Sequence, residues 1–361
     1  MKYKIDWEHH PIYIQIYKLI RDDIIENVYS YGAKLPSKRL LCSELGVSTI
    51  TVEHAYALLC DEGYIEAKER SGYFVIFQKT DGFVTSNEQH TIHNIPVPKV
   101  HNYPLFPYSV LCKTMRKVLS DYAEEILEKS ANQGTQELRE AIQKYLIRNR
   151  GMKVTSEQIV IGSGAEYLYG LIIDLLGRKQ IYGIESPSYK KIEQVYLSAE
   201  VSYEKLNLSH DGIDSEALAN SKANILHTTP YRSFPTGITA SANKRHEYIR
   251  WSQKNGHFII EDDFESEFSV SSKSEDTLFS LSPYDNVIYL NTFSKTISPA
   301  LRIGYMVLPK PLVVEFENKL GFYSCTVPTF EQYVIAELIN NGDFERHINR
   351  VRRKIRKEGK A

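Results

Sequence analysis

The sequence predicts an α/β protein with more than one domain: a small, mostly helical module at the N-terminus and a larger unit built on a mostly parallel β-sheet. Residues 1–77 show short helical patterns followed by a hairpin pattern, whereas residues 104–361 alternate helical stretches with short β-branched runs. Short apolar runs between helices are typical of parallel strands that are covered by helices on both faces. Residues 78–103 are polar and aperiodic, which predicts a linker.

Composition restricts the class of protein before any motif is considered. The chain has 361 residues, of which 42% are hydrophobic and 25% charged, as in ordinary globular proteins. Its net charge of -1 gives no overall attraction to nucleic acid or anionic lipid. Its cysteines form no C-x-x-C pair, and it has neither a secretory core nor a bilayer-spanning apolar run. We therefore expect a cytoplasmic protein without disulfides, a metal site or a membrane partner.

Three helices are expected in the N-terminal module. Apolar residues at positions 12, 16, 19, 20, 24 and 28 lie on one face of a helix over residues 11–28. Ser37 and Ser48 are good N-caps for two further helices, because a serine oxygen accepts a hydrogen bond from the first free backbone N–H groups. Gly46 and Gly63 are suited to end those helices in the left-handed conformation.

A two-stranded wing is expected after these helices. Residues 64–67 and 73–77 are strand-like and flank a turn at 70–72. Two short helices at a tight turn, followed by a wing, predict a winged helix-turn-helix that binds double-stranded DNA. Residues 11–75 also resemble the GntR family of bacterial repressors, through the segments P-I-Y-I-Q-I-Y, K-L-P-S-K-R-L-L, L-G-V-S, T-V-E-H-A-Y-A-L-L-C-D-E-G-Y-I and S-G-Y-F-V.

The GntR resemblance implies a set of residues that contact an operator: Lys38, Arg39, Ser48, Thr49, Thr51, Ser71 and Gly72. Arg39 would contact a phosphate. The helix that starts at Ser48, the second of the helix-turn-helix, would enter the major groove, and the wing tip would lie near the minor groove. The alternative for Lys38 and Arg39 is a solvated helix face. The family usually has arginine at the position of Thr49, and residues 1–77 hold nine Lys/Arg against eleven Asp/Glu. Non-specific DNA affinity should therefore be weak for one module. The local cluster Lys34, Lys38, Arg39, Lys68 and Arg70 could still supply a basic stripe, which dimerisation would double.

In the larger unit, six short apolar runs are expected to be strands: residues 158–162, 180–185, 224–230, 257–264, 286–293 and 303–308. The run that ends in T-F-S-K places Lys295 behind small hydroxyl residues, with Arg302 seven positions further on. An amine beside hydroxyl and guanidinium groups can hold a cofactor that carries an aldehyde and a phosphate. The alternative is a solvated lysine in a loop.

Two further segments fit the same chemistry. Residues 163–165, S-G-A, follow one predicted strand and open a helix from Glu166, where backbone N–H groups can bind a phosphate. Asp262 lies at the end of the predicted strand that contains F-I-I (258–260). A carboxylate there can keep the nitrogen of a cofactor's ring protonated, and Asp263 is the adjacent candidate. The alternatives are an ordinary capped helix and a solvated carboxylate at a strand end.

From about residue 104 the chain resembles the fold-type I, aspartate-aminotransferase-like enzymes that use pyridoxal 5'-phosphate. The matching segments are G-T-Q-E-L-R (134–139), R-G-M (150–152), S-G-A (163–165), E-S-P-S-Y (185–189), F-P-T-G (234–237), E-D-D-F-E-S-E-F (261–268) and T-F-S-K (292–295) with Arg302. The whole arrangement resembles the MocR subfamily of GntR regulators, in which such a domain follows the DNA-binding module.

This second resemblance implies a cofactor site made of Ser163, Gly164, Ala165, Tyr189, Asp262, Thr292, Lys295 and Arg302. Lys295, the one residue with a catalytic role, would form a Schiff base with pyridoxal 5'-phosphate, and burial and a nearby cation would lower its pKa. Tyr189 would stack on the ring and Asp262 would hold its nitrogen protonated. Thr292 and Arg302 would complete the phosphate site.

The chain departs from the family at several positions. Phe264 stands where fold-type I enzymes have a tyrosine that donates to the ring hydroxyl, and F-P-T-G at 234–237 replaces the common N-P-T-G. Family members continue beyond the position of Ala361 into a small C-terminal domain, so we expect that subdomain to be incomplete here, by truncation or by divergence.

Three functions remain open from the sequence. We expect a homodimeric, DNA-binding transcriptional regulator that senses an amino acid or a vitamin B6 compound through pyridoxal 5'-phosphate. The alternatives are an aminotransferase with an accessory DNA-binding domain, and a regulator that has lost its cofactor. The missing ring contacts predict at most residual transaminase activity, because turnover needs a held and oriented substrate.

Overall fold

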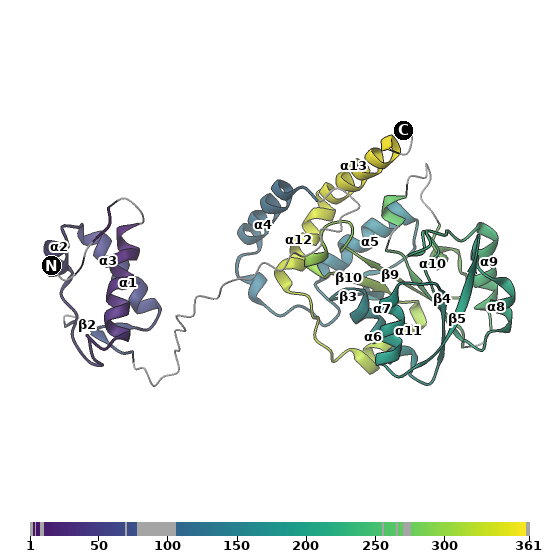
Figure 1. Cartoon of the computed structure of the whole chain (residues 1–361), viewed down its shortest axis with the longest axis horizontal. Helices are drawn as coiled ribbons and strands as arrows, with labels where there is room; N and C mark the ends of the chain where they lie inside the picture. Colours follow the sequence, from purple (N-terminus) through teal and green to yellow (C-terminus); the bar gives the residue numbers. More distant parts are fainter. Residues whose placement is uncertain are drawn as a thin grey trace. The chain divides into compact units, whose positions relative to one another are not determined.

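The computed structural model describes residues 3, 5–7, 11–68, 71–77, 106–254, 256–264, 266–269 and 276–358. The chain divides into two compact units, with the boundary between Val97 and Pro98 (Figure 1). The predicted linker, residues 78–103, lies outside the described residues. Each unit has its own hydrophobic core and is described separately.

The N-terminal unit contains the three expected helices and the hairpin. Its elements are α1 (Ile12–Ile25), α2 (Lys38–Leu45), α3 (Thr49–Asp61), β1 (Ile65–Lys68) and β2 (Gly72–Val75).

The predicted caps of α2 and α3 are confirmed, whereas α1 ends at Ile25, three residues before the predicted end. Ser37 and Ser48 cap α2 and α3 through side-chain oxygens that accept the backbone N–H of Leu40 and Thr51, each at 3.2 Å. Gly46 ends α2 in the left-handed region, with φ of 67°.

The core of the N-terminal unit lies between α1 and α3. Ile16 and Ile20 of α1 are 1% and 2% exposed, and Val52, Tyr56 and Leu59 of α3 are fully buried. The hairpin is antiparallel, with Ile65 paired to Val75, and both side chains join the same core. This core is therefore closed by elements of the unit itself.

The larger unit is built on an eight-stranded sheet in the order β3-β10-β9-β8-β7-β4-β5-β6. Its strands are β3 (Ile159–Gly162), β4 (Ile181–Ser186), β5 (Ser202–Ser209), β6 (Gly212–Ile213), β7 (Ile225–Thr228), β8 (Phe258–Asp262), β9 (Val287–Thr292) and β10 (Gly304–Val307). The pairs β4–β5, β4–β7, β7–β8 and β8–β9 are parallel, whereas β10 runs antiparallel to both β3 and β9, and β6 antiparallel to β5. The predicted mostly parallel sheet is therefore confirmed, with an antiparallel strand inserted near one edge.

Helices cover both faces of this sheet. They are α4 (Tyr108–Tyr122), α5 (Gln136–Arg150), α6 (Ala165–Leu176), α7 (Lys190–Ser198), α8 (Ser215–Asn220), α9 (Ala242–Trp251), α10 (Leu278–Leu281), α11 (Lys310–Leu320), α12 (Thr329–Asn340) and α13 (Asp343–Glu358) (Figure 1). Successive strand side chains point to opposite faces. Tyr305 and Val307 accordingly pack with α4, α5, α12 and α13, whereas Met306 and Leu308 pack with α6, α7 and α11.

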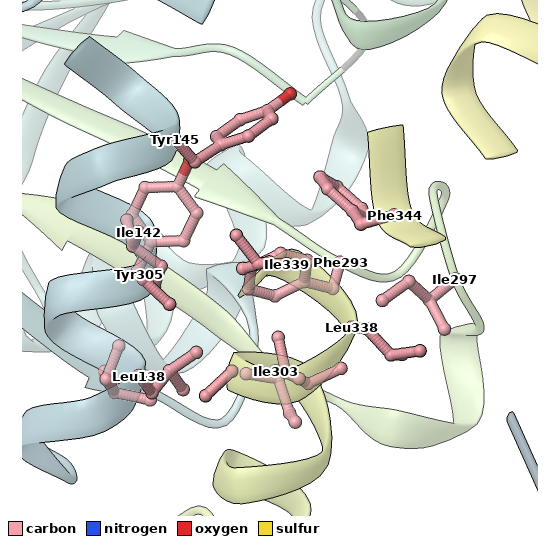
Figure 2. Packing of buried hydrophobic residues seen from close by; sticks show 14 of the residues in the cluster. Leu138, Ile142, Tyr145, Phe293, Ile297, Ile303, Tyr305, Leu338, Ile339 and Phe344 are labelled. Atoms are coloured by element: carbon pink, nitrogen blue, oxygen red, sulfur yellow. The ribbon is translucent and has the colours of Figure 1, made fainter. Parts of the chain in front are cut away.

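The connection from β9 to β10 is fixed by the first of these cores. Phe293 and Ile297 are 3% and 4% exposed, and they lie beside side chains of α12 and Phe344 of α13 (Figure 2). The backbone N–H of Phe293 donates to the carbonyl of Ile303 at 2.9 Å, and the N–H of Ile297 donates to the carbonyl of Phe293 at 2.9 Å. This loop, which carries Lys295, is therefore held at both sides by buried anchors.

Candidate functional site

Strand register brings the predicted phosphate-binding segments together at the carboxyl ends of the parallel strands. Gly304, the first residue of β10, pairs with Gly162 at the end of β3 and with Thr292 at the end of β9. Since β10 is antiparallel, the residues that precede it lie beside the residues that follow β3 and β9. Ser163 and Arg302 thus meet at the carboxyl ends of the parallel strands, where ligands bind in open α/β sheets.

The N-terminus of α6 and the guanidinium of Arg302 are in close contact. Gly164 precedes the helix with φ of +97°, and a Cβ added there would lie 2.9 Å from Arg302 Nη2. Ala165 is the first helical residue, one position earlier than expected from the sequence. Free backbone N–H groups at a helix N-terminus, facing a guanidinium, are a suitable site for a phosphate.

Glu166 joins two cations at this helix end. Its carboxylate lies 2.7 Å from Arg302 Nη2 and 2.5 Å from Lys191 Nζ. Burial alone would raise the pKa of Glu166, but the hydrogen bonds from Lys191 and Arg302 outweigh it and lower that pKa to about 2. Glu166 is therefore ionised at neutral pH and orients Arg302 beside Gly164.

Asp262 is a buried carboxylate at the end of β8 with an unsatisfied oxygen. The residue is 1% exposed, and its Oδ2 accepts a hydrogen bond from the hydroxyl of Tyr169 on α6. His227 Nε2 lies 3.6 Å from the same oxygen, while His227 Nδ1 is 2.8 Å from the Tyr196 hydroxyl. Among the described residues, Asp262 Oδ1 has no hydrogen-bond partner. A buried carboxylate oxygen of this kind fits a cationic N–H donor from a bound ring.

Lys295 lies in the anchored loop after β9, at an exposed position. Its Nζ is 4.5 Å from the centre of the Phe264 ring, two residues beyond Asp262. The expected burial of Lys295 is therefore wrong: the buried neighbours Phe293 and Ile297 fix the loop, whereas the side chain between them points outward. Thr292, at the end of β9, is 7% exposed, as its place inside the sheet requires.

Two loops at the same sheet edge carry the remaining aromatic residues. Tyr189 is half-buried immediately before α7, and its ring centre lies 6.1 Å from that of Phe234, nearly perpendicular. Glu185 links these loops, because its carboxylate accepts hydrogen bonds from the Thr228 hydroxyl, the Thr229 backbone N–H and the Ser233 hydroxyl. The arrangement holds Tyr189 near the ends of β4 and β7.

Sequence reasoning missed the partners of these residues. Tyr169 and His227 contact Asp262, and Lys191 contacts Glu166, yet none was a candidate. One signal was present for His227: it is a polar residue inside an otherwise apolar strand, N-I-L-H-T-T. Tyr169 lies one turn after Ala165 on α6, so its direction toward the sheet follows only once the helix start is known.

The predicted DNA-binding residues lie around α2, α3 and the hairpin. Arg39 and Thr49 are exposed on the first turns of α2 and α3, and Ser71 is exposed at the turn before β2. Gly72 has φ of +113°, and a Cβ there would lie 3.0 Å from Cε of Lys34. The remaining turn residue, Arg70, lies outside the described residues.

The polar side chains at this surface also make contacts within the unit. Lys38 Nζ lies 2.6 Å from Glu53 Oε1, which joins α2 to α3. The Ser48 and Thr51 hydroxyls are 2.8 Å apart. Lys38, Ser48 and Thr51 are thus partly engaged, which leaves Arg39 and Thr49 as the more accessible of the candidates on these helices.

Both units match known families. Residues 12–75 match the gntR family of bacterial regulatory proteins, and residues 102–360 match aminotransferase class I and II. The chain is 32% identical over 358 residues to the HTH-type transcriptional regulator YdeL of Bacillus subtilis, covering 96% of this chain and 77% of that protein. It is 26% identical over 367 residues to the probable rhizopine catabolism regulatory protein MocR of Rhizobium meliloti, covering 95% and 74%. The chain belongs to the MocR subfamily of GntR-type transcriptional regulators.

Other relatives agree with this assignment. The chain is 28% identical over 359 residues to the pyridoxine biosynthesis transcriptional regulator PdxR of Corynebacterium glutamicum, covering 96% of this chain and 78% of that protein. Among solved structures, kynurenine aminotransferase of Pyrococcus horikoshii aligns with a TM-score of 0.63 and 26% identity, covering 70% of this chain and 65% of that one. This MocR-type regulator therefore joins a GntR module to a fold-type I aminotransferase domain. In the described part of the chain, no helix is long and apolar enough to cross a membrane.

Proposed function

We propose that the aminotransferase-like domain of this regulator binds pyridoxal 5'-phosphate and senses an amino acid or a vitamin B6 compound through it. The observation that carries this proposal is the buried Asp262 oxygen without a partner in the described residues, at the sheet edge where Arg302 faces the N-terminus of α6. A carboxylate without a compensating cation is costly to bury, and a protonated ring nitrogen would supply that cation. The residues present thus fit the cofactor.

Each residue would have a separate role toward the cofactor. The Gly164 N–H donates to the Gly162 carbonyl at 2.8 Å, so the N–H groups at the start of α6, from Ala165 onward, would bind the phosphate together with Arg302, and Thr292 would lie beside them. Asp262 would hold a proton on the ring nitrogen, and Tyr189 would contact the ring face. The bound cofactor supplies an aldehyde that reacts with amines and a ring that withdraws electrons. Lys295, exposed and held by its loop, would supply the amine that bonds covalently to that aldehyde.

A regulatory role agrees with the residues around Lys295. Phe264 lies directly beside the Lys295 amine and has no hydroxyl to donate to the ring. Without that hydrogen bond we expect transamination to be slow, which suits a sensor that must hold its effector rather than turn it over. The relative PdxR is named for pyridoxine biosynthesis and MocR for rhizopine catabolism, and both names support small-molecule control.

The winged helix-turn-helix would bind an operator, and a homodimer would place two such modules on one duplex. Effector binding changes operator affinity only if it favours one of two arrangements of the dimer. The assays are therefore operator affinity with and without candidate amines, and the sedimentation mass of the full chain.

Cofactor binding is tested by titrating the purified full-length protein with pyridoxal 5'-phosphate and recording absorbance. We expect a long-wavelength band in the wild type that Lys295→Ala abolishes. Asp262→Asn should weaken binding by about tenfold or more, the effect of removing one charge-assisted hydrogen bond. Lys310→Ala, at the exposed start of α11, is the matched control and should leave the titration unchanged. A wild type that gives no band, or Lys295→Ala that retains it, would refute the proposal.

A further inference from the structure

An isoleucine stands on the outward face of the second helix of the helix-turn-helix. Ile50, the second residue of α3, is 65% exposed and does not join the core of its unit. The inward face of α3 is complete without it, since Val52, Ala55, Tyr56 and Leu59 are fully buried. A β-branched residue also has a slightly lower helix propensity than an unbranched one. Neither packing nor helix propensity therefore accounts for isoleucine at this position.

The polar side chains around Ile50 are held by other parts of the unit. Glu53 pairs with Lys38 at 2.6 Å, and the His54 ring packs edge-on against Tyr13 of α1, with 5.8 Å between ring centres. The hydroxyls of Ser48 and Thr51 contact each other. Ile50 is also a large exposed side chain in the first turn of α3. Among the described residues, it makes no such contact within the unit.

The helix also lacks the side chains that most often read guanine. Its sequence, T-I-T-V-E-H-A-Y-A-L-L-C-D, contains no lysine or arginine, and bidentate contact from these residues to guanine is the commonest specific contact in the major groove. The apolar group that the major groove offers is the C5 methyl of thymine, which an apolar side chain can contact. An exposed isoleucine at the start of the helix that enters the groove matches that methyl group.

We propose that Ile50 is a specificity-determining residue that contacts a thymine methyl group in each operator half-site. The inference rests on the proposed operator binding and adds the chemical group that is read. Lys38 and Arg39, at the start of α2, are placed to contact phosphate and would contribute affinity without sequence preference. The half-site is then recognised through an A·T pair at the position of Ile50, and through no lysine or arginine contact to guanine from α3.

The test replaces single thymines by deoxyuridine, which lacks only the methyl group. Duplexes are first selected from a random DNA library with the full-length protein, and each thymine of the selected site is then replaced in turn. We expect one position per half-site at which deoxyuridine weakens wild-type binding by about fourfold, the fold-change for burying one methyl group. Ile50→Ala should bind the thymine and deoxyuridine duplexes equally at that position, whereas Thr49→Ala should retain the difference.

The outcomes separate this inference from the proposed function. If no duplex is enriched by selection, operator binding itself is refuted and the inference falls with it. If duplexes are enriched but no deoxyuridine substitution matters, or if Ile50→Ala keeps the wild-type ratio, only the role of Ile50 is refuted. Because Ile50 lies outside the core, Ile50→Ala should melt at the wild-type temperature in circular dichroism, so that a loss of discrimination is not a loss of folding.

Discussion

Arg150 is the position where one substitution should affect the aminotransferase-like domain most strongly. It ends α5, and its Nη2 lies 3.1 Å from Asp263 Oδ2 and 3.5 Å from Glu267 Oε1. The three side chains are 3%, 1% and 4% exposed, and the Tyr289 hydroxyl donates to Asp263 at 2.8 Å. Arg150→Met keeps an unbranched apolar stem but removes the positive charge, so that two carboxylates remain buried without it.

The expected cost follows from this burial. Burial raises the pKa of Asp263 to about 6 even with Arg150 beside it, which shows how little solvation the carboxylate keeps. Removing one partner of a buried ion pair costs about 3–5 kcal/mol. In a domain of this size each kcal/mol lowers the melting temperature by about 2–4 °C, so Arg150→Met should lower it by roughly 6–20 °C.

Differential scanning calorimetry of the full chain measures this effect, read on the larger of the two unfolding transitions. Arg148→Met is the matched control on the same helix. Arg148 Nε lies 2.9 Å from Glu345, but its side chain is 52% exposed, so that its loss should cost at most about 1 kcal/mol. The defect of Arg150→Met should also shrink at pH 5 relative to pH 8, because protonation neutralises Asp263, whose pKa is already raised to about 6 by burial. Equal melting temperatures for the two variants, or a defect independent of pH, would refute the reasoning.

Three other predictions follow from single contacts. Gly164→Ala should weaken cofactor binding about tenfold in an absorbance titration, because its Cβ would lie 2.9 Å from Arg302 Nη2, whereas Gly170→Ala, with open space around the new Cβ, should not. Burial raises the pKa of Glu261 from 4.5 to about 8, so its contribution to stability is complete below pH 4.5 and is lost as pH rises through 8. The melting temperature should therefore fall between pH 4.5 and 8, and less so in Glu261→Gln. Tyr169→Phe should weaken cofactor binding without lowering the melting temperature by more than a few degrees, and unchanged affinity would contradict its role beside the buried carboxylate.

The parts of the fold that depend on neighbouring residues could be predicted from the sequence. Ser37 and Ser48 cap their helices as expected, since a cap involves atoms only three residues apart. Each of the six predicted apolar runs contains a strand, because the pattern that predicts a strand also lies within a few neighbouring residues. The direction of β10 could not be predicted, because an apolar run has the same pattern in parallel and antiparallel pairing, and its partners β3 and β9 lie elsewhere in the chain.

The candidate site divides in the same way. Lys295 and Arg302 were found from a local segment, and register then places Arg302 beside the segment that follows β3. Tyr169 escaped notice because it is 93 residues from Asp262 in sequence and meets it only through packing of α6 on the sheet. The burial expected for Lys295 failed for another reason: apolar neighbours indicate that a loop is anchored, and they do not indicate where the residue between them points.

The adjacent carboxylates of β8 and its following loop show how one segment serves two purposes. Asp263 points to the α5 side, where Arg150 compensates its charge, although one of its oxygens also lacks a partner among the described residues. Asp262 points to the α6 side, where its contacts are a tyrosine hydroxyl and a histidine rather than an arginine or lysine. Successive residues of an extended chain face opposite ways, so the alternation alone separates the two environments. The carboxylate that still needs a cation is therefore Asp262, which is the physical reason to assign the cofactor's ring nitrogen to it and a structural role to Asp263.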